Sequence, residues 1–208
     1  MKYSHLRSFC LWLCLLALAA LSGCGERDPV LPRLGAGDVV LAFGDSLTYG
    51  TGARAGESYP EVLAGLIGRT VVSEGVPGER TAEGLERLAD VLDVHQPRIM
   101  LLCLGGNDML RKIDATETET NLRQMIDTAT ARGIGVVLIG VPKPALLGGT
   151  AKFYERIAED YAIPYEGEAL NEILKDNAYK SDPIHPNARG YQLLATALAE
   201  VLRRSGAI

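Results

Sequence analysis

Residues 39–50 read VVLAFGDSLTYG, a short apolar run that passes directly into a turn flanked by glycines. A short, largely apolar run rich in Val and Leu is typical of a strand buried inside a parallel sheet. The turn that follows would place Ser46 at the carboxyl end of this strand and at the start of a helix. Backbone N–H groups at such a position favour developing negative charge. The stretch therefore predicts a strand that delivers a serine to one edge of a sheet.

Apolar runs and amphipathic segments alternate along the rest of the chain. We expect four buried strands, over residues 39–43, 70–73, 98–104 and 135–140. The expected helices cover residues 59–67, 81–94, 116–131, 151–161 and 187–204. This alternation predicts a three-layer α/β/α fold with a parallel central sheet and helices on both faces. Chemistry in such folds gathers at the carboxyl ends of the strands.

A second motif, SDPIHPN, occupies residues 181–187. Its aspartate stands three residues before its histidine, in a segment broken by prolines. Such a segment can fold back so that the carboxylate accepts the Nδ1–H of the imidazole. Nε2 of His185, with Asp182 behind it, would then be free to take a proton from Ser46. The alternative is a solvated turn that caps the last helix. His95 has no acidic partner at matching spacing, and we expect it to be a surface residue.

Two glycine-containing turns complete the pattern. LGGND at residues 104–108 follows a buried strand, and the Asn107 amide could donate to an oxyanion, although these residues also suit an ordinary turn. GVPG at residues 75–78 follows the second strand, and one of its glycines could present a bare N–H group. A plain loop is the alternative there.

Ser46 by itself allows other interpretations, a helix-capping serine or a phosphate-binding loop. The chain contains neither G-x-G-x-x-G nor G-x-x-x-x-G-K-[ST], which argues against a nucleotide site. It also lacks G-x-S-x-G, which argues against the nucleophile elbow of α/β-hydrolases.

In chain order, these motifs resemble the four sequence blocks of the SGNH (GDSL) hydrolase superfamily, across residues 39–202. The sequence is most similar to the small bacterial thioesterase I, lysophospholipase and arylesterase group, in which GDSLTYG, His-Gln-Pro, LGGND and D-x-I-H-P-N recur. The resemblance implies a flavodoxin-like sheet of about five strands. It also implies hydrolysis of short- to medium-chain acyl esters, lysophospholipids or thioesters, without a metal or organic cofactor.

Carried over by position, the resemblance implies that Ser46 is the nucleophile. His185 would be the general base and then the general acid, oriented by Asp182. The oxyanion hole would consist of the Ser46 N–H, the Gly78 N–H and the side chain of Asn107.

One position departs from the family pattern. The second block often begins with Asn, where this chain has Ser73, and Gly75 therefore stays open as an alternative to Gly78. Gly78 is preferred because the donor glycine of the family closes this loop. Asp45 and Asp108 also match family positions, and we expect them to brace loops.

The N-terminus differs from the rest of the chain. Basic residues precede an apolar run of 13 residues, 9–21, which is shorter than the roughly 20 residues of a membrane-spanning helix. LSGC at residues 21–24 resembles a bacterial lipobox with Cys24 as the lipidated residue. An ordinary secretory signal or an uncleaved anchor is the alternative. Gly25 after the cysteine favours the outer membrane, facing the periplasm.

These features divide the chain into a signal peptide (1–23), a lipidated cysteine with a tether (24–37) and a hydrolase domain (38–208). Removal of the signal takes away two basic residues and no acidic ones, which changes the formal charge from −5 to −7. A chain this acidic lacks the positive surface that binds nucleic acid or anionic lipid. Membrane attachment would therefore depend on acyl chains. No obligate protein partner is evident, and the expected partner is a small-molecule or lipid ester.

Two alternative functions remain open at this level. The protein could be an O-acetyl esterase acting on envelope polysaccharide. It could also be a catalytically silent lipoprotein that binds glycans, although Ser46, Asp182 and His185 argue against this.

Overall fold

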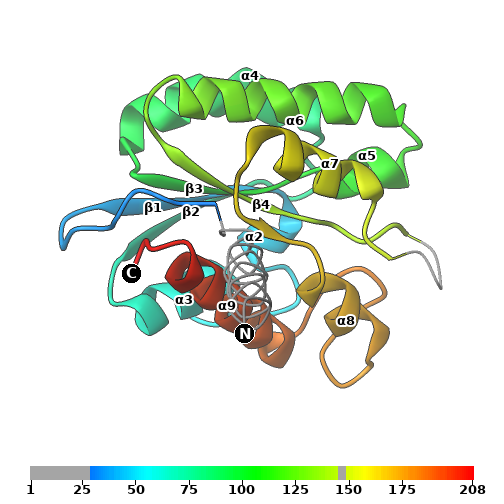
Figure 1. The fold of residues 1–208 in the computed structure, drawn as a ribbon. Coiled ribbons are helices and arrows are strands. Elements are labelled where there is room, and N and C mark those ends of the chain that lie inside the picture. The colour runs from blue at the N-terminus through cyan, green and yellow to red at the C-terminus, as the bar shows by residue number, and fades with distance from the viewer. Residues whose placement is uncertain (1–28, 145–148) are drawn as a thin grey trace, which may run out of the picture.

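The computed structural model describes residues 29–144 and 149–208, and its centre is a parallel β-sheet (Figure 1). The order of the strands is β2-β1-β3-β4-β5, and every neighbouring pair is parallel. The strands are β1 (Val39–Gly44), β2 (Thr70–Gly75), β3 (Ile99–Cys103), β4 (Gly135–Ile139) and β5 (Tyr165–Glu166). The expected α/β fold with a parallel sheet of about five strands is confirmed.

Helices cover both faces of this sheet (Figure 1). On one face lie α4 (Thr81–His95), α6 (Ala115–Thr130) and α7 (Lys152–Tyr161). On the other lie α3 (Tyr59–Ile67), α8 (Ala169–Lys175) and α9 (Ala188–Arg204). Both faces of the sheet are thus shielded from water, which explains why its central strands are apolar throughout rather than alternating.

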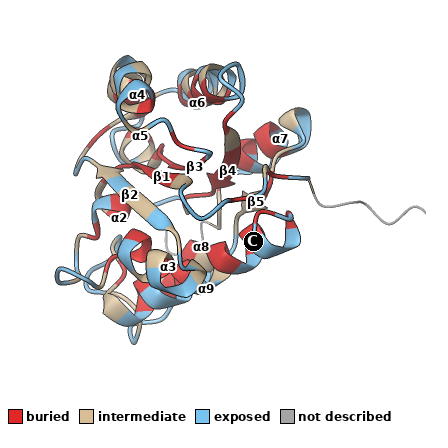
Figure 2. Ribbon diagram, turned by 90° about the vertical axis from the view of Figure 1, so that its left-hand side faces the viewer, coloured by how far each residue is buried: buried red, intermediate tan, exposed pale blue. Residues whose placement is uncertain are grey.

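The core follows from this layering. Every residue of β3 is buried, as are all residues of β1 after Val39, whereas β2 at the sheet edge contains no fully buried residue. Figure 2 shows the buried residues gathered on the central strands and on the sides of the helices that face them. The rigid centre of the molecule is therefore the β1–β3 pair, and the chain leaves it at the end where the glycine-containing turns lie.

Three short helices and one strand were not predicted as separate elements. Besides α8, these are α2 (Ser46–Tyr49), α5 (Gly106–Leu110) and the two-residue strand β5. Segments of four to seven residues complete at most two helical turns, so they show no apolar periodicity that a sequence pattern could reveal.

The predicted tether of residues 24–37 is wrong in its second half. Leu31 and Leu34 are buried in the core, and their N–H groups donate to the carbonyl oxygens of Ser205 (2.9 Å) and Ala207 (2.8 Å). The folded domain thus begins before residue 38, because these two leucines pack beside the C-terminus. The predicted signal peptide, Cys24 and residues up to 28 lie outside the described residues. Within the described residues, no helix has the length and apolar character needed to span a bilayer.

His95 is half-buried beside the sheet edge rather than on the open surface expected, and it has an acidic partner that is distant in sequence. Its Nε2 lies 2.8 Å from Oε1 of Glu74, and both side chains are partly buried. Glu74 comes from β2 and His95 from the end of α4, so only the packing of this helix beside the sheet edge brings them together.

Candidate active site

The site begins where β1 and β3 end side by side. Gly44 pairs with Cys103 in the parallel register, and a Cβ on Gly44 would overlap the Cys103 carbonyl oxygen and the Thr48 hydroxyl. Glycine is therefore required for β1 to turn into α2 at this point. As a result, Ser46 at the start of α2 and Asn107 in α5 emerge from neighbouring strand ends.

The structure brings Ser46, His185 and Asp182 together. His185 Nε2 lies 3.0 Å from Ser46 Oγ, although 139 positions separate the two residues, and His185 Nδ1 lies 2.7 Å from Asp182 Oδ2. The side chain of His185 is 14% exposed and that of Asp182 is 44% exposed. The imidazole thus sits between the serine and the carboxylate, and remains accessible from the outside.

Local hydrogen bonds aim the Asp182 carboxylate at the imidazole. Asp182 Oδ1 accepts the backbone N–H groups of Ile184 and His185, both at 2.9 Å, which leaves Oδ2 for the imidazole. Burial raises the pKa of Asp182, but the Ile184 N–H and the His185 side chain outweigh it, and the net pKa lies below the usual range. An ionised carboxylate can only accept, so Nδ1 donates to it and Nε2 is left to accept the Ser46 hydroxyl proton.

Packing fixes the histidine segment against the serine turn. The Tyr191 hydroxyl of α9 donates to the carbonyl oxygen of Thr51 at 2.8 Å, just beyond α2. Gly52 lies so close to Ser181 that a Cβ on it would overlap the Ser181 hydroxyl. Asn187 caps α9 by accepting the N–H groups of residues 189 and 190, so the helix starts directly after the histidine segment. The contacts of Tyr191 with Thr51 and of Gly52 with Ser181 join segments distant in sequence, and they set the distance between serine and imidazole.

Gly78 and Gly75 lie in different surroundings. Gly78 has φ +82° and lines the same cavity as Ser46 and Asn107. Gly75 is the last residue of β2, and a Cβ on it would overlap the backbone nitrogen of Tyr49. Its role is to allow α2 to pack on β2. Of the two glycines, the geometry favours Gly78 as a donor to a group beside Ser46.

The amide of Asn107 is held from two sides. Its Nδ2 donates to Asp45 Oδ2 at 3.1 Å and to the carbonyl oxygen of Glu79 at 3.0 Å. Asp45 Oδ1 also caps α2 by accepting the N–H of Leu47 at 2.9 Å. An oxyanion beside Ser46 would compete for one of the two Asn107 N–H groups. Besides the loop bracing expected of it, Asp45 contacts Asn107, a partner so distant in sequence that no local pattern records it.

Asp45 is a fully buried carboxyl group. Its desolvation raises the pKa to about 7, against the lowering effect of the hydrogen bonds from Leu47 and Asn107. The Coulombic effects of Glu79 and Asp108 add to the increase. The group that positions Asn107 therefore changes charge near neutral pH.

Two further carboxylates brace the loops around the site. Asp108 is buried and accepts the N–H and the hydroxyl of Thr81, which ties α5 to the start of α4. Glu79 pairs with Arg87 Nε at 2.6 Å, and the Arg87 guanidinium lies over the ring of Phe43. The bracing role expected of Asp108 fits these contacts, and Glu79 anchors the loop that carries Gly78.

Ser46, Gly78, Asn107 and His185 open into one cavity of about 710 Å³. Its apolar lining includes Leu47, Pro77, Leu110, Val141, Leu174 and Ile184. This volume is within the usual range for cavities that bind small organic molecules. The arrangement of nucleophile, base and N–H groups around one cavity is suited to acyl transfer.

Comparison with known proteins gives a consistent result. The profile of the GDSL-like lipase/acylhydrolase family matches residues 42–193. The chain is 31% identical over 179 residues to "Thioesterase 1/protease 1/lysophospholipase L1" of Escherichia coli strain K12, covering 82% of this chain and 86% of that protein. It is 28% identical over 178 residues to an arylesterase of Vibrio mimicus, and the match covers 80% of this chain and 89% of that protein.

Solved structures agree with the fold. AlinE4, described as an SGNH-hydrolase family esterase, is 32% identical with a TM-score of 0.65, over 83% of this chain and 98% of that chain. The esterase EstA from Pseudoalteromonas has a TM-score of 0.72 at 21% identity, over 80% of this chain and 97% of that chain. At this identity the match shows similarity of fold alone.

Asp45 makes a testable contribution to stability. Between its ordinary pKa of 3.8 and its raised pKa of about 7, the folded protein holds a proton that the unfolded chain releases. This carboxyl therefore lowers the free energy of unfolding as pH rises through that window. The Asp45→Asn variant has an amide at this position, which does not titrate in this pH range. We expect the free energy of unfolding of the wild type, minus that of the variant, to fall by about 4 kcal/mol from about pH 4 to about pH 8.

Urea denaturation of both proteins across this pH range measures the difference. Any constant effect of the new amide beside Asn107 cancels, because only the pH dependence is compared. A difference that does not change with pH would show that Asp45 titrates in its ordinary range.

Proposed function

The chain belongs to the GDSL-like lipase/acylhydrolase family and is a carboxylic ester hydrolase, and we propose that Ser46, His185 and Asp182 carry out its reaction. The observation that carries the proposal is the 3.0 Å separation of Ser46 Oγ and His185 Nε2, with Asp182 2.7 Å behind the imidazole. This is hydrogen-bond reach from nucleophile to base and from base to orienting group.

The reaction proceeds by acyl transfer in two steps. Ser46 Oγ attacks the ester carbonyl carbon while His185 Nε2 takes the hydroxyl proton, and the Asp182 carboxylate stabilises the resulting imidazolium. The imidazolium then gives this proton to the leaving alkoxide, which departs as the alcohol and leaves an acyl-Ser46 ester. Water, deprotonated by the same imidazole, attacks this ester and releases the acid and free Ser46.

The oxyanion of each tetrahedral intermediate is stabilised by the N–H groups of Ser46 and Gly78 and by the side chain of Asn107. Backbone donors at the start of α2 are fixed before the reaction, so they cost no reorganisation when charge develops. The Asn107 amide exchanges one of its ground-state contacts, with Asp45 or with Glu79, for the oxyanion.

The natural substrates are short- to medium-chain acyl esters, with lysophospholipids and thioesters in the same range. The cavity volume of about 710 Å³ and its apolar side chains support this choice, since an acetyl group would leave most of that surface uncovered. Two relatives carry names of the same kind, a thioesterase and lysophospholipase, and an arylesterase. An O-acetyl esterase would be the outcome if the cavity accepted only acetyl groups.

The mature protein is anchored by lipid on Cys24, in the outer membrane and facing the periplasm. The support for this comes from the sequence, a 13-residue apolar run followed by LSGC and then Gly25. Residues 25–30 are the part of the chain that separates this cysteine from Leu31, the first buried leucine of the domain.

Removal of the nucleophile tests the reaction. We expect Ser46→Ala to abolish hydrolysis of p-nitrophenyl butyrate and labelling by a fluorophosphonate probe. Asn107→Ala should keep the labelling but lose about 10²- to 10³-fold in kcat, as is usual when one oxyanion donor is removed. Unchanged melting temperatures would exclude unfolding as the cause. Wild-type activity in Ser46→Ala would refute the proposal, and an inert wild type would favour the silent glycan-binding lipoprotein.

A series of p-nitrophenyl esters tests the acyl specificity. We expect kcat/KM to rise from acetate to the medium-chain esters, because each added methylene buries apolar surface worth about 0.8 kcal/mol when it is fully covered. Ile184→Ala, which removes part of the exposed apolar lining, should reduce this slope. Activity limited to acetate would instead favour action on acetylated glycans.

Expression of the full chain in bacteria tests the anchor. We expect radiolabelled palmitate to be incorporated into the wild type and not into Cys24→Ser, and the wild type to sediment with the outer membrane. Labelling that survives the Cys24→Ser change would contradict the proposed anchor.

A further inference from the structure

The cavity beside Ser46 differs in charge from the chain as a whole. The full chain has a net charge of −5. Yet the lysines that line this cavity, Lys143, Lys175 and Lys180, face a single acidic side chain in its lining, Asp45. Burial raises the pKa of Asp45 to about 7, so its negative charge is incomplete near neutral pH. The cavity is therefore basic inside an acidic protein.

Two of these lysines have no neutralising partner. In residues 29–144 and 149–208, no carboxylate lies within ion-pair distance of Lys143 or Lys180. Lys180 Nζ donates to the Leu174 carbonyl oxygen at 2.9 Å, a contact that orients the ammonium group without removing its charge. Lys175 Nζ lies 2.7 Å from Glu172 Oε1, but both side chains are more than half exposed and the pair is weak.

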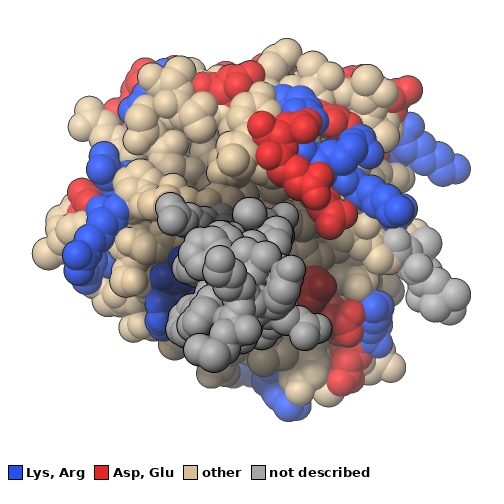
Figure 3. All heavy atoms as spheres, in the orientation of Figure 1, with Lys and Arg blue, Asp and Glu red and all other residues tan. Residues whose placement is uncertain are grey.

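Charged side chains over α6 and α7 are arranged differently. Over α6 and α7, acidic and basic groups are interspersed (Figure 3). Arg123 contacts Glu119 at 2.8 Å and Asp160 at 2.6 Å, and Arg156 contacts Glu119 at 2.6 Å. Arg123 and Arg156 thus serve ion pairs within the protein. The cavity lysines are left to face whatever enters the cavity.

Their positions connect them to the reacting groups. Lys143 follows β4 at the carboxyl edge of the sheet, the edge that also presents Ser46. Lys180 forms an isolated bridge with Pro186, the residue next to His185. Lys175 ends α8 next to Leu174, whose carbonyl oxygen accepts from Lys180 Nζ.

We propose that Lys143, Lys175 and Lys180 form a subsite for an anionic oxyacid group, such as a phosphate, carried by the ester substrate. The subsite rests on the proposed function, because it selects among esters that Ser46 cleaves. Unpaired cations of one sign in a cleft with low-dielectric walls focus the field and concentrate anions there. The subsite does not touch the reacting atoms, so it acts on substrate capture and KM rather than on kcat.

Two soluble esters that differ only in the phosphate test the subsite, 1-butyrylglycerol and 1-butyrylglycerol 3-phosphate. We expect the wild type to show a kcat/KM about tenfold higher for the phosphate ester, a preference that falls as salt rises from about 50 mM to about 500 mM. The triple variant Lys143→Met, Lys175→Met, Lys180→Met should treat both esters alike. The KM for the phosphate ester should rise, and the ratio of the two kcat/KM values should fall to about one.

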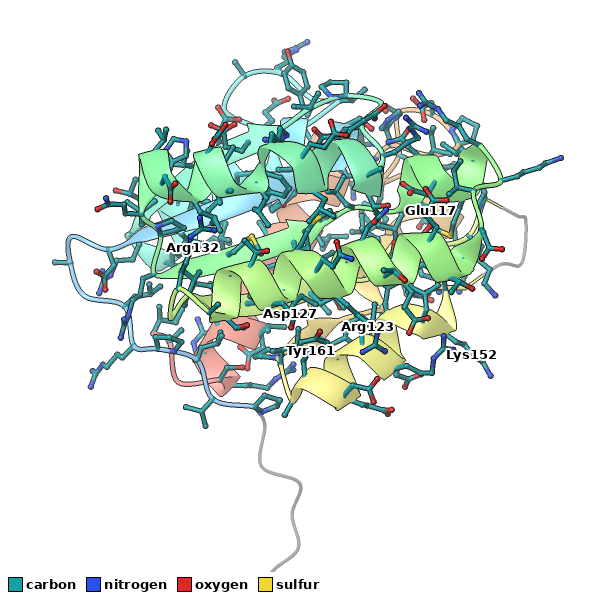
Figure 4. The ribbon with its side chains drawn as sticks, turned by 90° about the horizontal axis from the view of Figure 1, so that it is seen from above. Glu117, Arg123, Asp127, Arg132, Lys152 and Tyr161 are labelled. Carbon is teal, nitrogen blue, oxygen red and sulfur yellow. The ribbon has the colours of Figure 1, made fainter. Side chains whose placement is uncertain are left out.

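Lys152→Met is the matched control. Lys152 projects from α7 away from the rest of that helix in Figure 4, is exposed, and does not line the cavity. The Lys152→Met change removes one positive charge, as Lys143→Met does, and should leave the preference intact. If the triple variant fails to fold, Lys143→Met alone, at an exposed position, tests the subsite. This change should lower the preference for the phosphate ester about threefold.

Equal kcat/KM values for the two esters in the wild type would overturn the subsite, as would an equal loss in Lys152→Met and Lys143→Met. Failure of the proposed function has a different signature, because the wild type would then hydrolyse neither glycerol ester nor p-nitrophenyl butyrate.

Discussion

The hydrogen bond of 3.0 Å between Ser46 Oγ and His185 Nε2 joins two segments that lie 139 positions apart. Neither segment could form it alone. The serine turn is fixed because Gly44 lets β1 end against β3, and the histidine segment is fixed because α9 starts directly after it. Contacts such as Tyr191 with Thr51 then lock the two together. The proposed chemistry thus depends on the packing of α9 beside the serine turn.

Two carboxyl groups in this site have opposite environments. Asp182 is partly exposed and accepts two backbone N–H groups, which lower its pKa and keep it ionised behind the imidazole. Asp45 is fully buried, and desolvation raises its pKa to about 7. The first can stabilise a positive imidazolium at all physiological pH values. The second holds Asn107 with a charge that depends on pH, so in the proposed mechanism one aspartate orients the base and the other orients an oxyanion donor.

The outer surface of the protein and the cavity beside Ser46 differ in charge. An acidic surface with interspersed ion pairs, such as those over α6 and α7, keeps the molecule apart from anionic partners. The cavity has the opposite local sign, since Lys143 and Lys180 have no carboxylate partner in the described part of the chain. A substrate with an apolar acyl chain and an anionic group would match both the lining and the charge of this cavity.

The central strands, the long helices and the motifs around Ser46, Asn107 and His185 can be predicted from the chain alone, because burial on both faces and turn chemistry leave local patterns. It could not reveal β5 or the short helices, which are too brief to carry a period. Three-dimensional packing was needed to show that Leu31 belongs to the core rather than to a tether and that Asp45 holds Asn107. The physical reason is that local patterns record how much a residue is buried, whereas its partner is selected by the packing of elements distant in the chain.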